Sequence, residues 1–256
     1  MLQTIMTEIG VGYIELFLMF LVAFIASVFH SVSGFAGALI MVIALAPILG
    51  IKTVVPVVAV AAVMNNATRL WVFRRELVTP IYFSLIVTAL PGMVIGAFIF
   101  VHLPVHTVAL VLGIFMVLSV PGRRFMNNRG VKVGRWGFTA IGPVYGVIAG
   151  VTMGGALMLA PFFLGAGLVG SQIIAITGAI GVTLNMTKVI VFGASPLLNF
   201  PLICVGLILG LCTIPAAYAG RWILQRTPIR VHTVLVEVVI LAGAAFFFSQ
   251  GLSGYF

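Results

Sequence analysis

Long apolar runs, separated by short polar breaks, constrain the fold of this chain more than any other feature. Of the 256 residues, 62% are hydrophobic and only 7% are charged, whereas soluble domains carry about 25% charged residues. Because a chain with so little charge cannot cover a surface that faces water, its apolar side chains must face lipid. We therefore predict an all-α, polytopic bundle of transmembrane helices without a sizeable soluble domain.

Breaks in the apolar runs divide the chain into ten predicted segments, five in each half. Several of the segments are short for a complete span of about 20 residues, the second and the seventh in particular. We therefore expect broken or re-entrant helices there, and eight to ten crossings in total. The predicted segments cover 11–30, 33–50, 54–73, 78–101, 105–120, 136–151, 153–169, 171–193, 198–222 and 229–250.

Basic residues supply the net charge of +9 and gather in the connections between the apolar runs. The connection 121–135 holds five basic residues and no acidic one, and further clusters lie at 74–75 and 221–230. Since basic loops stay on the cytoplasmic side of a membrane, we predict a multi-pass protein of the cell (inner) membrane with loop 121–135 in the cytoplasm. Both termini then lie outside if all ten segments cross. This topology explains the charge without a nucleic-acid partner.

The two halves carry matching patterns in the same order. The pattern N-x-T-[R/K]-x-x-V-F occurs at 66–73 and again at 185–192, and His-Thr-Val occurs at 106–108 and at 232–234. Because five segments per half is an odd number, the halves are expected to have opposite orientations, as in many secondary transporters. The predicted organisation is a first transmembrane repeat at 1–120, a cytoplasmic basic linker at 121–135 and a second transmembrane repeat at 136–256.

Two stretches of the sequence resemble the sulfite exporter TauE/SafE family, the TSUP permeases. The first stretch reads HSVSGFAGALIMVIALAPILG and is followed by a span ending NNATRLWVFRR; the second reads GVTMGGALMLAPFFLGAGL and is followed by GVTLNMTKVIVF. The resemblance covers nearly the whole chain and implies export of small sulfur-containing anions such as sulfite, sulfoacetate or other organosulfonates. Pro47 follows Gly37 by ten residues whereas Pro161 follows Gly155 by six, so we expect the two breaks to differ in shape.

Polar and glycine residues interrupt one apolar run in each half. The first break comprises His30, Ser31, Ser33, Gly34 and Gly37, and the second comprises Thr152, Gly154 and Gly155. A break exposes free N–H groups at the start of the next half-helix, and these can bind an anion together with the positive end of the helix dipole. The alternative is an ordinary interfacial loop. Because the break recurs, we favour an anion site.

A polar patch follows each break. The first patch contains Asn66, Thr68 and Arg69, and the second contains Asn185, Thr187 and Lys188. A cation inside a membrane is costly and normally faces protein or a water-filled cavity. The alternative for both cations is that they extend to the nearby membrane edge. We place both patches in the predicted substrate-binding site. Asn66 and Asn185 are expected to flank an anion that lies between the two breaks, and Arg69 and Lys188 to attract the anion or hold a gate rather than bind it tightly.

Two further features have a predicted role. Glu237 lies inside the last segment, and since acidic residues within membranes often relay protons, it is our candidate for proton coupling, with a purely structural role as the alternative. Glycines at 142, 146, 150 and 154 follow one another at steps of four, which allows two helix backbones to approach closely. We expect that ladder to serve helix packing.

Enzyme motifs are absent from the sequence. It contains no HExxH, no GxSxG, no P-loop, no metal-ligand cluster and no Asp, so we predict no catalytic residue, no cofactor and no metal. The favoured function is alternating-access export of a small anion, with that anion and membrane lipid as partners and the oligomeric state open. A passive anion channel and a non-transporting membrane subunit are the alternatives.

Overall fold

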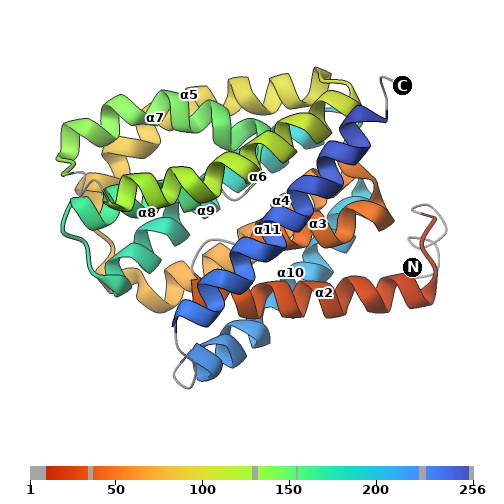
Figure 1. The fold of residues 1–256 in the computed structure, drawn as a ribbon, viewed down its shortest axis with the longest axis horizontal. Coiled ribbons are helices and arrows are strands. Elements are labelled where there is room, and N and C mark those ends of the chain that lie inside the picture. Colours follow the sequence, from red (N-terminus) through yellow and green to blue (C-terminus); the bar gives the residue numbers. More distant parts are fainter. Residues whose placement is uncertain (1–9, 34–36, 129–131, 154, 225–228, 254–256) are drawn as a thin grey trace.

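A computed structural model describes residues 10–33, 37–128, 132–153, 155–224 and 229–253 (Figure 1). In these residues the regular structure is entirely helical. The first half forms α2 (Tyr13–Ser33), α3 (Gly37–Leu49), α4 (Ile51–Phe73), the short 3-10 helix η1 (Arg74–Glu76), α5 (Thr79–His102) and α6 (Val105–Asn128). The second half forms α7 (Arg135–Val151), α8 (Ala156–Gly165), α9 (Gly170–Gly193), α10 (Phe200–Leu224) and α11 (Ile229–Leu252).

The all-α membrane fold is confirmed. Within the described residues, five stretches are long and apolar enough to cross a membrane by length and composition: Tyr13–His30, Ile51–Glu76, Thr79–His102, Val105–Gly122 and Gly170–Gly193. Helix α6 continues to Asn128 rather than ending near residue 120, so it extends into the stretch that the sequence suggested as a linker.

Helices α3 and α8 are the broken elements that the sequence predicted. They contain 13 and 10 residues, which at 1.5 Å per residue gives lengths of about 20 Å and about 15 Å. The hydrocarbon core is about 30 Å thick, so neither helix is a complete span. Each helix is followed by a glycine in the left-handed region, Gly50 after α3 and Gly167 after α8, a conformation that other residues rarely adopt.

The glycine ladder of α7 packs against α5, as the sequence predicted. At Gly142, Gly146 and Gly150 an added Cβ would overlap atoms of α5, so these two helices approach closely (Figure 1). From Gly142 to Gly150 the contact on α5 moves from Thr88 to Ala97, and the two helices therefore run parallel. The fourth glycine, at position 154, lies outside the described residues.

The packing of the helices is compatible with two inverted repeats. Helix α4 packs on α9, its counterpart in the other half, and α6 packs on α11. Arg69 contacts Thr177 while Asn66 lies against Gly181, so α4 and α9 run antiparallel; α6 and α11 do so too. A two-fold axis in the membrane plane makes an element antiparallel to its own counterpart, whereas an axis along the membrane normal would make it parallel.

The described helix ends that flank the basic clusters lie at one end of the bundle. Helices α5 and α7 begin at the same end, α4 and α10 run parallel, and the end of α6 lies against the beginning of α11. The connections α4–α5, α6–α7 and α10–α11 therefore lie together, while α2 begins and α11 ends on the opposite side (Figure 1). This is the arrangement that the predicted topology requires; that the basic end faces the cytoplasm stays a prediction.

Candidate functional site

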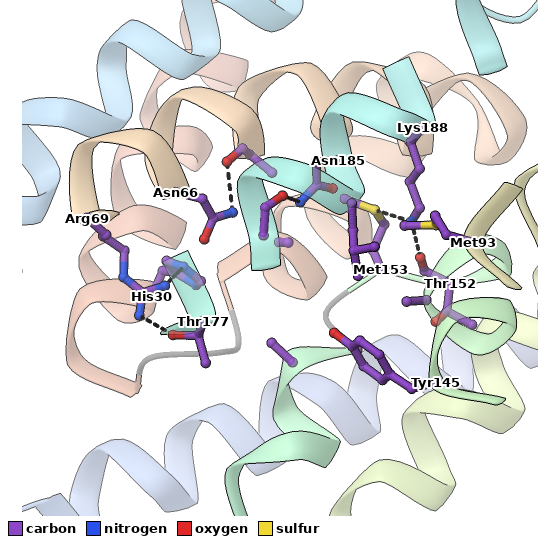
Figure 2. A pocket seen from close by; sticks show the side chains of 17 residues that line it. His30, Asn66, Arg69, Met93, Tyr145, Thr152, Met153, Thr177, Asn185 and Lys188 are labelled. Atoms are coloured by element: carbon purple, nitrogen blue, oxygen red, sulfur yellow. Dashed lines mark hydrogen bonds between the residues drawn. The ribbon is translucent and has the colours of Figure 1, made fainter. Parts of the chain in front are cut away.

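A cavity of about 60 Å³ lies between α4 and α9, and its wall also includes residues of α2, α3, α5, α7, α8 and the break that follows α7 (Figure 2). Both halves of the chain contribute to its wall. The polar residues of the wall are His30, Asn66, Arg69, Tyr145, Thr152, Thr177, Asn185 and Lys188. The structure thus brings together the first break, the second break and both polar patches, which lie far apart in the sequence.

Arg69 occupies one end of the cavity and is only 8% exposed. Its Nη1 lies 2.7 Å from His30 Nε2, and its Nη2 donates to Thr177 Oγ1 at 3.3 Å. The first residue of α3, Gly37, donates its backbone N–H to His30 Nδ1 at 3.2 Å. The beginning of the half-helix α3 therefore reaches the cavity through His30.

His30 has more donors around it than a neutral imidazole can accept. The Arg69 guanidinium and the Gly37 N–H can only donate, yet they face the two ring nitrogens of His30. A neutral imidazole carries one acceptor nitrogen and one N–H. With either tautomer, one of these two donors therefore faces a ring N–H instead of an acceptor. An oxygen atom of an anion in the cavity would provide an acceptor for this group.

Lys188 occupies the opposite end of the cavity (Figure 2) and is 2% exposed. Its Nζ donates to the backbone carbonyl of Thr152, and it lies 3.1 Å from Met153 Sδ. That carbonyl is free to accept because α7 ends at the second break, where the regular helical hydrogen bonds stop. The break thus positions the lysine, while the Thr152 hydroxyl is bonded to Ile148 O at 2.6 Å.

Asn66 and Asn185 lie between the two cations (Figure 2). Asn66 Nδ2 donates to Ala62 O at 2.8 Å, and Asn185 Nδ2 donates to Gly181 O at 2.7 Å. The same bond to the carbonyl four residues earlier therefore recurs in both halves. The Asn66 side chain lies against Gly181, where a Cβ would overlap it, so glycine at this position makes room for the amide.

Several predicted residues lie outside the cavity wall or outside the described part of the chain. Thr68 and Thr187 do not line the cavity; their hydroxyls are bonded to carbonyls of their own helices, at 3.0 and 2.9 Å. Helical geometry explains this, because residues i and i+3 share a face and i+2 does not. Gly155 lines the cavity. Gly34 and Gly154 lie outside the described residues, as do the side chains of Ser31 and Ser33.

Glu237 is not among the residues that line the cavity. It forms a bidentate ion pair with Arg124, whose side chain is 65% exposed, and so joins α11 to α6. The hydrogen bond and the charge of Glu237 raise the pKa of Arg124. The structure therefore places this carboxylate in a contact between helices; its predicted role in coupling stays untested.

The cavity wall carries two buried cations and no acidic side chain. Of the four acidic residues in the chain, Glu8 lies outside the described residues, Glu15 accepts the N–H of Gly12, Glu76 is exposed in η1, and Glu237 pairs with Arg124. A buried charge without a partner of opposite sign is costly. Such a cavity favours a bound anion.

Sequence reasoning did not find Tyr145, Thr177, Met93 and Met153, which also line the cavity. A signal for Thr177 was available: it precedes Gly181, Asn185 and Lys188 by four, eight and eleven residues, and those spacings place all four on one helix face.

Comparison with known proteins identifies the family of this chain. Neither the curated proteins nor the solved structures give a match to the chain. The family model described as Sulfite exporter TauE/SafE matches residues 19–247, which include every residue that lines the cavity. The resemblance found in the sequence is thereby confirmed, and the chain belongs to the TauE/SafE sulfite exporter family.

Proposed function

We propose that this membrane protein exports a small sulfur-containing anion, with sulfite as the first candidate, across the cell (inner) membrane by alternating access. One observation carries the proposal: a cavity shared by both halves holds Arg69 and Lys188, and none of the described residues in its wall is acidic. The family to which the chain belongs supports the choice of sulfite.

The two cations and the neutral donors suit transient binding. An oxyanion that leaves water needs its hydration replaced by hydrogen-bond donors. Arg69 and Lys188 supply charge at the two ends, and the Asn66 and Asn185 amides lie between them. Because the Arg69 guanidinium is already bonded to His30 and Thr177, only part of its donor set faces the ligand. Partial engagement of this kind favours release as well as binding.

The size of the cavity favours a compact anion. The cavity has a volume of only about 60 Å³. A space of this size suits a compact anion such as sulfite. A longer organosulfonate such as sulfoacetate requires the cavity to widen when the halves move relative to each other.

Flux into proteoliposomes tests the proposal. The purified chain is reconstituted and uptake is compared for sulfite, thiosulfate, sulfoacetate, acetate and chloride. We expect saturable sulfite flux that Lys188→Met abolishes. Lys52→Met is the matched control, because Lys52 donates to Leu103 O at 2.8 Å, away from the cavity. Flux that never saturates would indicate a channel, and the absence of flux for all five anions would overturn the proposal.

A further inference from the structure

The two cations of the cavity occupy equivalent positions in the two halves but differ in chemistry. Arg69 and Lys188 are both the fourth residue of the N-x-T-[R/K] pattern, and both line the cavity. An arginine side chain in a protein keeps its proton, whereas a buried lysine readily gives it up. One end of the site is therefore permanently charged, and the other end can change its charge.

The partners of Lys188 match a neutral amine. An ammonium group has three N–H donors and an amine has two. Among the described residues, the hydrogen-bond acceptors of Nζ are the Thr152 carbonyl and Met153 Sδ. A proton bound at Nζ brings a third donor, which needs an acceptor in the cavity. An oxygen atom of a bound anion meets that need and also neutralises the added charge.

The surroundings of Lys188 oppose its charge when the site is empty. The ammonium would be buried without a carboxylate, in the same cavity as the Arg69 guanidinium, so desolvation and repulsion both act against it. An anion next to Nζ reverses both effects. Anion binding is therefore expected to take up a proton, and anion release to return it.

The other titratable groups near the site do not offer this exchange. His30 accepts from the Arg69 guanidinium, which holds it neutral, and the Tyr145 phenol is neutral near pH 7. Tyr82 of α5 is hydrogen-bonded to the hydroxyl of Thr183, at another position on α9. The charged residues of η1 lie beyond the end of α4. Among the residues of the wall, Lys188 remains the group that can exchange a proton with the anion.

We infer that Lys188 couples the anion to a proton: its neutral amine takes up one proton from the compartment from which the anion enters and releases it where the anion leaves. The inference rests on the proposed function. The anion and the proton move in the same direction, and the amine returns to its starting state after each cycle. With a divalent anion one negative charge leaves the cell per cycle, so an inside-negative membrane potential favours export.

Proton uptake on sulfite binding tests the inference in the purified chain. Calorimetric titrations in buffers of different ionisation enthalpy give the protons taken up per bound anion. The protonation of sulfite itself contributes equally to the proton uptake of every variant. The difference in proton uptake between wild type and Lys188→Arg therefore measures the contribution of Lys188. We expect about one proton fewer in the variant. We also expect wild-type affinity to fall more steeply with rising pH, by up to about tenfold per pH unit relative to the variant.

The outcomes separate this inference from the proposed function. Equal proton uptake in wild type and Lys188→Arg, with binding intact, overturns the inference and leaves the transporter in place. Loss of the uptake in Glu237→Gln, but not in Lys188→Arg, assigns coupling to Glu237 and also overturns it. If Lys188→Arg binds no anion, proton uptake is measured for thiosulfate binding to the wild type instead, because thiosulfate holds no proton near neutral pH. Thiosulfate binding without proton uptake would then overturn the inference. If the wild type neither binds nor transports any of the anions, the proposed function itself is overturned.

Discussion

Replacing Arg69 by methionine should weaken anion binding without destabilising the empty protein. The guanidinium is buried, its partners are the neutral groups His30 and Thr177, and no carboxylate contacts it. Removing an uncompensated buried charge in favour of an apolar side chain is often neutral or stabilising. The change also removes the excess donor at His30. We therefore expect the melting temperature of the empty protein to stay constant or to rise.

The loss of affinity follows from the hydrogen bond that the anion loses. A bond to a charged group contributes about 1.5–3 kcal/mol, which corresponds to about 10- to 150-fold weaker binding. At a sulfite concentration of about 100 times the wild-type Kd, bound ligand stabilises the wild type by about 2.7 kcal/mol. The same concentration would stabilise the Arg69→Met variant by only about 0.3–1.4 kcal/mol.

Thermal unfolding of the purified protein, with and without sulfite, measures both effects at once. Lys52→Met is the control, since Lys52 is a cation of the same helix that bonds to Leu103 O away from the cavity. It should retain the full stabilisation by sulfite. An Arg69→Met variant that melts lower when empty, yet keeps the wild-type response to sulfite, would show that Arg69 is structural and would refute the reasoning.

Four further predictions follow from the same geometry. Asn66→Ala and Asn185→Ala should each weaken sulfite binding by about 0.5–1.5 kcal/mol; wild-type affinity in both, measured by titration, would exclude the amides from the site. Gly150→Leu should destabilise the protein by about 1–3 kcal/mol, because its Cβ would lie 2.7 Å from backbone atoms of α5, and unchanged thermal unfolding would contradict this. Because Glu237 lies in an ion pair outside the cavity wall, we expect the flux of Glu237→Gln, measured against a pH gradient, to keep its pH dependence. Loss of that pH dependence would show that this carboxylate carries the proton. A cysteine at Asn128 should react with a membrane-impermeant reagent only after the cytoplasmic side is opened, and rapid labelling of intact cells would reverse the predicted topology.

The helical segments and several residues of the candidate site can be predicted from the amino-acid sequence alone. Apolar runs cannot face water, so their lengths and breaks predicted the ten helices, including the short α3 and α8. The step of four residues between Gly142, Gly146 and Gly150 also predicted a close approach of two helix backbones, which the structure shows between α7 and α5. The repeated N-x-T-[R/K] pattern identified Asn66, Arg69, Asn185 and Lys188, all of which line the cavity, because a polar patch in an apolar run must face protein or water.

Only the tertiary structure decided which groups meet in the cavity and which do not. Thr68 and Thr187 belong to the same pattern, but the packing of α4 against α9 turns them away from the cavity. Thr177 reaches Arg69 across a separation of 108 residues, and Glu237 finds Arg124 across 113. A local sequence pattern predicts which face of a helix is polar, but not which neighbouring helix covers that face. That choice depends on how all the helices pack together, and the packing places one lysine beside the carbonyl of the second break, in a cavity that suits an anion.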